Sequence, residues 1–366
     1  MSQNALLFIA DISGYTKFIN QTDVEHSGHI ISELLEIILA KNTLNLELAE
    51  IEGDALFMYK IRSDANIEEI WIQAKQMFLA FHEHLLLYKH RRICDCGACL
   101  TANQLTLKFV VHIAPIDFIE VAGQKKPYGS EIVKVHRLLK NDIENSEYLL
   151  LSHEIILALG IPSNVGKAYQ YETQYDFGLY MYSGIDMSEL RTEVSHIPKL
   201  TVTKSKIELL KCNIHIAAPI DDLYEITSNF AFRKLWNKGA DSISYKKNRV
   251  NRAGSTHLCI INGDLIEFET LDVDAGSKPL VYSERSTSVP YISQMDNFYA
   301  FNETETGTNI ELTLFVTFKK HRAWAKYLLK GLFRKNILKG FNNLKDLAEQ
   351  TGLKKLQEQV NEYEEP

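Results

Sequence analysis

The sequence predicts two domains, an α/β domain followed by an α+β domain. A chain of 366 residues is long enough for about two domains, each with its own core. Strand-like apolar runs alternate with helix-like runs in the first half, whereas strand-like runs dominate the second half. A polar stretch without strong periodicity separates the halves. We therefore expect a first domain over residues 1–187, a linker over 188–203, a second domain over 204–350 and a charged tail over 351–366.

The composition is that of an ordinary globular protein, with 45% apolar and 24% charged residues. The formal net charge of −7 argues against a nucleic-acid binder, since such a domain carries a basic surface. The N-terminus MSQNALLFIADIS has no basic region and is interrupted by Asp11, so it does not resemble a signal peptide. No apolar stretch approaches the roughly 18 residues that span a bilayer. We expect a cytoplasmic protein without nucleic-acid partners.

Two aspartates mark the strongest candidate site. Asp11 follows the apolar run at residues 6–9, and Asp54 follows Gly53 in the apolar run at residues 46–58. Each position is typical of a strand end or hairpin tip, where sites are usually built. Mg²⁺ binds one or two carboxylates together with substrate phosphate oxygens, and two such ions can stabilise the attacking and leaving oxygens of an in-line displacement. The pair therefore predicts a site for two divalent ions and a triphosphate.

Four motifs, in order over about residues 1–185, resemble those of the catalytic domain of class III adenylate and guanylate cyclases. DISGYT, which begins at Asp11, resembles the D-I-x-G-[FY]-T motif, and the GDA at Gly53 resembles the second metal-binding hairpin. LKFVVHIAP, which contains His112, is similar to the strand ending in G-I-H-x-G. PYGSEIVKVHRLLKN, which begins at Pro127, is similar to the helix start W-G-x-x-V-N-x-A-x-R-[ML]. The resemblance implies an α/β domain with a ferredoxin-like core.

The resemblance also implies roles for single residues. It implies that Asp11, Ile12 and Asp54 hold the divalent metal, Mg²⁺ or Mn²⁺. It places the purine-reading residues at Glu50 and Lys126. A carboxylate at Glu50 can accept hydrogen bonds from N1–H and the amino group of guanine, which indicates GTP. Lys126 matches neither residue that is usual at the partner position, so GTP and ATP both stay open.

The catalytic positions are only partly present. Arg137 stands at the position of the transition-state arginine, but Val133 replaces the asparagine four residues earlier and offers no donor. Residues 168–182, where the triphosphate lysine should fall, contain no Lys or Arg, and one missing donor typically slows such a reaction by about 10²- to 10³-fold. A nucleotide cyclase (a phosphorus–oxygen lyase) of weak or altered activity and a non-catalytic pseudo-cyclase therefore both stay open. Because the family shares each site between two domains and this chain has one, the resemblance implies a head-to-tail homodimer.

Three of the five cysteines lie close together in RRICDCGACLTAN, at Cys94, Cys96 and Cys99. An odd number of cysteines in a chain without a secretory signal favours thiols or a metal over disulfides. Zn²⁺ takes four N or S ligands, and this segment supplies three, with His90 or His84 as the fourth. A zinc or redox-sensing site is one hypothesis. The other is a reduced, partly exposed thiol loop.

The second half has the element order of a START-like (SRPBCC) helix-grip domain. One strand begins near residue 207, two short helices cover 220–236, about six antiparallel strands cover 242–318, and a long helix covers 319–349. This order, with the segment AAPIDDLYEITSNFAFRKLWNKG, resembles that family and a group of uncharacterised bacterial proteins that join a cyclase-like half to a START-like half. The resemblance implies binding of a lipid or another hydrophobic small molecule, and thus a sensor. The strand aromatics either line such a cavity or fill the core.

The long C-terminal helix carries nine Lys or Arg and no acid between Lys319 and Lys345. A basic amphipathic helix can lie on an anionic membrane. In the alternative, which the fold favours, its apolar residues pack on the sheet and its basic residues face solvent. The apolar set includes Trp324, Leu328, Leu332, Phe333, Ile337 and Phe341.

Overall fold

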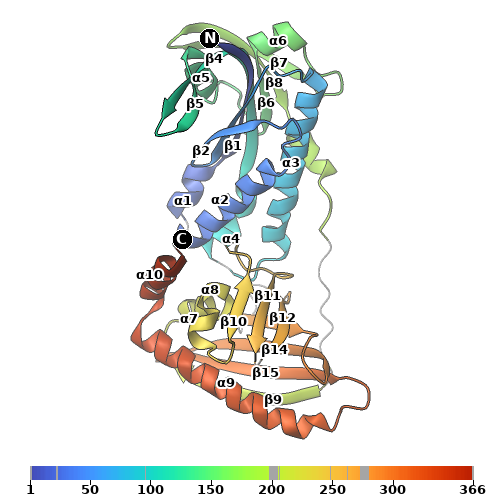
Figure 1. Cartoon of the computed structure of the whole chain (residues 1–366), viewed down its shortest axis with the longest axis vertical. Helices are drawn as coiled ribbons and strands as arrows, with labels where there is room; N and C mark the ends of the chain where they lie inside the picture. The colour runs from blue at the N-terminus through green and yellow to red at the C-terminus, as the bar shows by residue number, and fades with distance from the viewer. Residues whose placement is uncertain are drawn as a thin grey trace. The chain divides into compact units, whose positions relative to one another are not determined.

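The computed structural model describes residues 2–21, 24–94, 96–197, 205, 207–247, 249–261, 263–272 and 280–364. The chain forms two compact units (Figure 1). The first comprises Met1–Lys89 and Cys96–Ile197, and the second comprises His90–Asp95 and Pro198–Pro366. Within these described ranges, no helix combines the length and the apolarity that crossing a bilayer requires.

The division at Ile197 falls inside the expected linker, but the start of that linker belongs to the first unit. Residues expected to be irregular form the 3₁₀ helix η2 (Ser188–Glu193). Arg191 in η2 forms an ion pair of 2.6 Å with the buried carboxylate of Glu147. Because a buried carboxylate needs such a partner, this pair holds η2 against the first unit.

The first unit is built on a mixed sheet with the order β2-β3-β1-β4-β6-β8-β7. The central strand β1 pairs antiparallel with β3 on one side and with β4 on the other, and β4 runs parallel to β6. The short strand β5 pairs with the far end of β4. The strands are β1 (Gln3–Ser13), β2 (Glu47–Glu52), β3 (Ala55–Ile61), β4 (Thr106–Val121), β5 (Gln124–Tyr128), β6 (Tyr148–Ser152), β7 (Ala168–Tyr175) and β8 (Gly178–Asp186).

Both faces of this sheet are covered. Every residue of β1 from Ala5 to Ala10 is buried, and successive strand residues point to opposite faces. On one face, Leu7 and Ile9 pack in a core with Val135 of α5. Charged residues of β1 are therefore confined to the strand ends, where Asp11 lies. The helices of this unit are α1 (Tyr15–Gln21), α2 (Val24–Leu39), α3 (Ile67–His90), α4 (Gly97–Thr101), α5 (Ser130–Arg137) and α6 (His153–Leu159), and the 3₁₀ helix η1 (Ala102–Gln104) follows α4.

The second unit is built on an antiparallel sheet with the order β10-β11-β12-β13-β14-β15-β9. One strand, two short helices, six strands and a long helix follow one another, which is the order that the sequence predicts; membership of the helix-grip family stays a prediction. The strands are β9 (Ile207–Ile216), β10 (Ser242–Tyr245), β11 (Thr256–Ile261), β12 (Asp264–Thr270), β13 (Leu280–Ser286), β14 (Ile292–Thr304) and β15 (Gly307–Phe318). The helices are α7 (Ile220–Ser228), α8 (Phe230–Trp236), α9 (Ala325–Gln350) and α10 (Leu353–Glu364), and α10 occupies most of the expected tail.

The long helix α9 is buried unevenly. Its second half packs through Phe341 and Leu344, which are almost fully buried. Its first half packs only in part: Ala325 and Leu329 are buried in the core. Leu328 is 68% and Leu332 50% exposed, and Trp324 just before the helix is 57% exposed. The expectation that the apolar residues pack on the sheet is therefore right for the second half and wrong for these three positions.

Candidate functional site

The two predicted metal aspartates meet at one end of the β1–β3 strand pair. Asp11 lies opposite Ala55 in the strand register, and Asp54 lies in the turn between β2 and β3. The amide of Ile12 donates a hydrogen bond of 3.1 Å to the carbonyl oxygen of Asp54. Gly53 in this turn has a φ of 64°, a conformation that glycine adopts without strain. The register and the turn together bring two half-buried carboxylates side by side.

The two carboxylates influence one another electrostatically. Burial, and then the negative charge of Asp11, raise the pKa of Asp54 to about 6. A hydrogen bond from the main chain and the positive charge of Lys108 oppose this rise only in part. A divalent cation would relieve the repulsion between the two groups.

Lys108 is a third charged group at this position, and the sequence pattern does not single it out. It lies opposite Asp11 in the β1–β4 register, and its Nζ is 2.9 Å from Asp11 Oδ2. Burial disfavours the charge of Lys108. The attraction of Asp11, with contributions from Tyr148 and Asp54, outweighs burial and raises the pKa of Lys108. Its only sequence signal is a lysine near the start of an otherwise apolar strand.

The donor set fits a hard divalent cation, which prefers oxygen ligands. Asp11 and Asp54 offer carboxylate oxygens. Ile12, the third position implied by the resemblance, has a buried side chain, so its potential ligand is its main-chain oxygen. Lys108 is a competing cation, since its ammonium group already contacts Asp11.

The two predicted purine-reading residues lie together. Glu50 is in β2 and Lys126 in β5, and Lys126 Nζ is 2.9 Å from Glu50 Oε2. Each side chain is 43% exposed, so both keep atoms that a ligand can reach. The pair offers one hydrogen-bond acceptor group and one donor group at the same place.

Arg137, the predicted catalytic residue, ends α5. Its Nη2 is 3.2 Å from Asp176 in the turn between β7 and β8, and both side chains are about half exposed. Val133, one turn earlier, is 55% exposed and has no hydrogen-bonding group. The described structure thus places Arg137 at a surface, where a second molecule can reach it.

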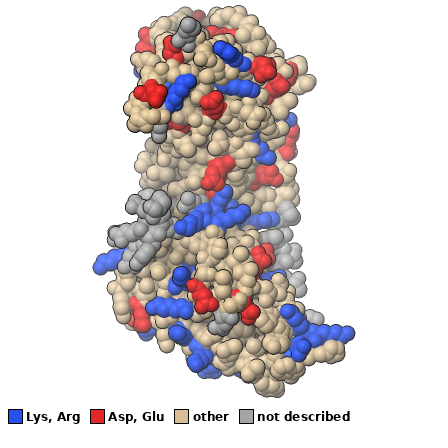
Figure 2. Space-filling view, viewed as in Figure 1, with Lys and Arg blue, Asp and Glu red and all other residues tan. Residues whose placement is uncertain are grey.

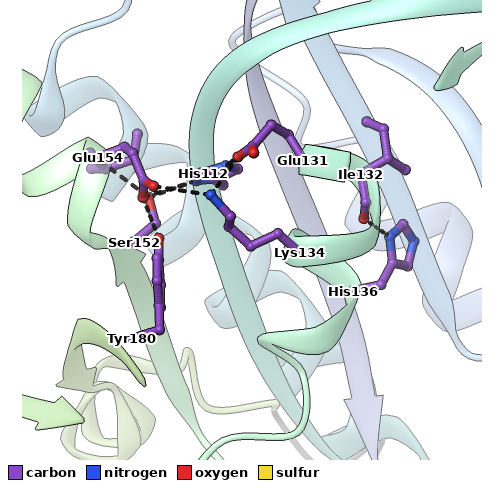
Figure 3. Close-up of polar contacts among 9 residues, drawn as sticks. His112, Glu131, Ile132, Lys134, His136, Ser152, Glu154 and Tyr180 are labelled. Carbon is purple, nitrogen blue, oxygen red and sulfur yellow. Dashed lines mark hydrogen bonds and ion pairs between the residues drawn. The ribbon is translucent and has the colours of Figure 1, made fainter. Parts of the chain in front are cut away.

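A buried polar cluster surrounds His112 (Figure 3). The Nε2 atom of His112 is 2.9 Å from Glu131 Oε2, and its Nδ1 is 3.0 Å from Ser152 Oγ. Lys134 Nζ lies 2.7 Å from Glu131 and 3.3 Å from Glu154. We call this group the His112 cluster; its members are His112, Glu131, Lys134, Ser152, Glu154 and Tyr180, whose hydroxyl donates to Glu154.

The charges of the His112 cluster are internally balanced. Burial lowers the pKa of His112 although both glutamates favour its charged form. The carboxylates of Glu131 and Glu154 hold the pKa of Lys134 above its usual value against the effect of burial. His112, Glu131 and Glu154 could together hold a metal ion, but Lys134 already supplies the positive charge. The cluster joins β4, α5, β6, α6 and β8, so it fixes the helix that carries Arg137.

A histidine that the sequence pattern does not single out lies beside two of the loop cysteines. His26 in α2 has its Nδ1 3.2 Å from Cys96 Sγ and 3.8 Å from Cys99 Sγ. Its ligand atom and those of Cys96 and Cys99 all lie within 4.8 Å of one another. His84 instead contacts the buried Glu33 at 2.7 Å. Among the described residues, His26 completes the group, and the choice of His84 or His90 is wrong because the fourth partner comes from a different helix.

The second unit contains a cavity of about 210 Å³. Trp236, Phe268 and Phe341 contribute apolar walls, while the buried ion pair of Arg233 and Glu284 lies at the polar side. Some of the strand aromatics therefore line a cavity, whereas others pack on one another, as Phe298 does on Phe315.

Comparisons of the sequence give two partial matches. Residues 31–148 match the family described as "Protein of unknown function (DUF2652)". An uncharacterized protein of Mycobacterium tuberculosis (strain ATCC 25618 / H37Rv) is 28% identical over 129 residues, which are 35% of this chain and 60% of that protein. The chain thus spans only 60% of the length of this curated relative.

Comparisons of the structure find nucleotide cyclases. The guanylate cyclase domain of RhGC from Catenaria anguillulae in complex with GTP is 10% identical, with 50% of this chain and 96% of that chain covered and a TM-score of 0.38. The adenylyl cyclase CyaB from P. aeruginosa is 14% identical, with 51% and 95% covered and a TM-score of 0.33. At these values the similarity assigns no function.

Proposed function

We propose that the first unit binds a purine nucleoside triphosphate with two divalent ions, Mg²⁺ or Mn²⁺, at the end of β1. The observation that carries this proposal is the convergence of Asp11 and Asp54, where burial and repulsion raise the pKa of Asp54 to about 6. Two half-buried carboxylates that repel one another gain strongly from a divalent ion. The metal would neutralise the charge of the triphosphate.

Lys108 supplies a cation that β7 and β8 lack. Its ammonium group has three N–H donors, and at present one partner is Asp11 at 2.9 Å. When a metal ion binds Asp11, Lys108 can donate instead to a phosphate oxygen, which is a charge-assisted hydrogen bond. We expect Lys108 to fill the role of the missing triphosphate lysine.

The Glu50–Lys126 pair is proposed to read the base. Guanine offers acceptors at O6 and N7 and donors at N1 and its amino group, so it can engage the lysine and the carboxylate together. Adenine lacks the O6 acceptor. The pair therefore favours GTP over ATP.

Cyclisation is the reaction class that this site suits. The ribose 3′ oxygen would attack the α-phosphorus and lose its proton to solvent, while the bond from that phosphorus to the bridging oxygen breaks and pyrophosphate leaves. Arg137 from a second copy of the chain would stabilise the charge of the transition state. Because Val133 offers no donor, we expect turnover about 10²- to 10³-fold slower than at a fully equipped site. In the alternative, a pseudo-cyclase, the nucleotide binds without being turned over.

Calorimetry with GTP and ATP, with and without Mn²⁺, tests the proposal. We expect metal-dependent binding that Asp54→Asn weakens at least tenfold, because one of the two metal carboxylates is neutralised. Asp64→Asn is the matched control, since Asp64 is a 95% exposed aspartate outside the site. Equal binding without metal, or an equal loss in both variants, contradicts the site. An assay for cyclic nucleotide with the same protein separates the cyclase from the pseudo-cyclase.

A second candidate function rests on the cavity of the second unit. Its volume of about 210 Å³ is below the roughly 300 to 1,000 Å³ of pockets for drug-sized ligands, so we propose a small apolar ligand rather than a long-chain lipid. The Arg233–Glu284 pair would orient one polar group of that ligand.

Fluorescence of the full chain tests this second candidate. Trp236 lines the cavity, so a small apolar molecule should change its emission. Leu312→Phe, which fills the cavity, should abolish the change, whereas Leu265→Phe, at an exposed position of β12, should not. A response that survives Leu312→Phe excludes the cavity as the binding place.

A further inference from the structure

We propose that His26, Cys96 and Cys99 of the first unit, with Cys94 two residues ahead of Cys96, form a structural zinc site. The ligand atoms of His26, Cys96 and Cys99 lie within 4.8 Å of one another, and we assign Cys94 as the fourth ligand from its place two residues before Cys96 in the chain. Three thiolates and one imidazole are a donor set of closed, four-coordinate zinc sites. This site is separate from the proposed nucleotide site, and its failure would leave the nucleotide proposal unaffected.

The distances fit one tetrahedral ion. Zinc–nitrogen and zinc–sulfur bonds of about 2.1 and 2.3 Å place N and S ligands about 3.6 Å apart. His26 Nδ1 is 3.2 Å from Cys96 Sγ and 3.8 Å from Cys99 Sγ. A disulfide would need two sulfurs about 2.05 Å apart, and none of the three loop cysteines forms one in this structure.

The local chain is shaped to present two sulfurs to one ion. Cys96 caps the N-terminus of α4, and its Sγ accepts a hydrogen bond of 3.5 Å from the amide of Cys99. The amide of Leu100 bonds to the carbonyl oxygen of Cys96 at 3.0 Å, which closes the turn.

Through His26, a bound zinc ion would connect two distant segments of the first unit. It lies 70 residues before Cys96, so an ion bound to both residues ties α2 to the loop that leads through α4 and η1 into β4. Lys108 lies near the start of β4. Zinc would therefore hold the entry to the strand that carries Lys108, and its removal should loosen this part of the first unit.

Metal analysis of the full chain purified without added zinc tests the proposal. We expect about one zinc per chain, lost in Cys96→Ser, Cys99→Ser and His26→Ala. Cys212→Ser and Cys259→Ser are matched controls, because both thiols are buried and lie in the second unit, and they should keep the zinc. Retention of zinc in His26→Ala contradicts the assigned fourth ligand.

Cobalt keeps the proposal testable if the variants fold poorly. Wild-type protein stripped of metal should bind one Co²⁺ and show the intense absorption of a tetrahedral cobalt–thiolate centre, which added Zn²⁺ abolishes. Hydrogen exchange should show loss of protection in α2 and α4 on stripping. Protein that contains no zinc, gives no such absorption with Co²⁺ and forms a Cys96–Cys99 disulfide in mild oxidant overturns the site.

We also infer that the first half of α9 and the residues just before it bind an anionic lipid surface. Four apolar or aromatic side chains here are exposed: Tyr327 by 86%, Leu328 by 68%, Trp324 by 57% and Leu332 by 50%. Trp324, Leu328 and Leu332 are spaced by four residues and so form one stripe along the helix. Exposed stripes of this kind mark interaction surfaces.

The positive charge of this segment indicates that its binding partner is an anionic lipid surface. The segment from Lys319 to Lys345 has nine Lys or Arg and no acid, and Lys and Arg side chains mark the lower margin of the view in Figure 2, where α9 runs in Figure 1. An apolar stripe with Trp and Tyr, flanked by basic residues, is typical of a helix that lies in the headgroup region of an anionic bilayer. A nucleic acid would match the charge but not the exposed leucines.

Sedimentation with vesicles tests this inference. The full chain should bind phosphatidylcholine vesicles that contain phosphatidylserine, and binding should weaken with salt and without the anionic lipid. Leu328→Glu with Leu332→Glu should reduce binding at least tenfold. Leu265→Glu, which alters a 59% exposed leucine on β12, is the control for an added charge and should bind normally. Equal binding by all variants, or salt-sensitive binding to RNA in place of vesicles, overturns the lipid surface.

Discussion

The ammonium group of Lys108 lies 2.9 Å from the carboxylate of Asp11, on strands that pair in register. In the proposed site, a metal ion and Lys108 therefore compete for the same carboxylate. A triphosphate ends this competition because it gives Lys108 a different anionic partner. We thus expect metal and nucleotide to bind cooperatively, each raising the affinity for the other by the same factor.

Lys108→Met tests this competition. Loss of the ammonium group should raise the affinity for Mn²⁺ alone and lower the affinity for the nucleotide with Mn²⁺, each about tenfold or more, since a hydrogen bond to a charged group contributes about 1.5–3 kcal/mol. Calorimetry of both equilibria measures the change. Lys60→Met on β3, which removes a lysine paired with the exposed Asp64, is the matched control. Affinities that both fall, or both stay constant, contradict the competition.

The sequence predicts the aspartates of the site but not the lysine, for a physical reason. Asp11 and Asp54 interrupt apolar runs at turn signals, so local pattern reveals them. Lys108 acquires its role only through the register of β1 with β4, a pairing between residues far apart in the chain. The resemblance to the cyclases points to Glu50 and Lys126 one by one. Their ion pair depends on how β5 folds back against β4, which the local sequence does not show.

Contacts between distant segments also explain why the sequence misses His26 at the cysteine loop and the uneven burial of α9. His84 and His90 are near the cysteines in sequence, but His26 reaches them from α2. In α9, Leu328 and Phe341 look alike in sequence, yet Leu328 is exposed and Phe341 is 1% exposed. Helical spacing shows that residues share a face; tertiary packing alone decides where along the helix that face is covered.

Complementation tests the shared site. Asp54→Asn and Arg137→Ala should each abolish cyclic nucleotide formation, because one lacks the metal carboxylate and the other the transition-state arginine. A mixture of the two variants should regain part of the activity, since one of the two sites in a mixed head-to-tail dimer has both residues. Light scattering should show a dimer in the presence of GTP and Mn²⁺. Activity of Arg137→Ala alone would leave the arginine without its proposed role.

Removal of Lys134 should destabilise the first unit. Lys134→Met leaves Glu131 and Glu154 facing His112 without the nearby positive charge, and we expect a loss of about 1–2 kcal/mol, because these carboxylates are only partly exposed. Hydrogen exchange of α5 during urea titration measures the loss.

The control is Lys17→Met, at an exposed position of α1, which should have little effect. The added substitution Glu154→Gln should recover part of the stability by removing the uncompensated charge; no recovery would show that Lys134 acts by packing alone.

Acid should destabilise the second unit through His257. Burial lowers the pKa of His257 to about 4, and its ring stacks on Phe268 at 5.2 Å. An unfolded chain protonates the same residue near pH 6.5. Between pH 6.5 and 4 the unfolded state therefore binds a proton that the folded state does not, so stability is complete above this window and falls by about 2–3 kcal/mol across it.

His257→Gln should flatten this pH dependence, as measured by hydrogen exchange of β11 during urea titration at pH 7 and pH 5. His215→Gln, at an exposed histidine of β9, should retain it. A wild-type stability that is equal at both pH values would show that the folded state accommodates the protonated ring, against the burial that the structure gives it.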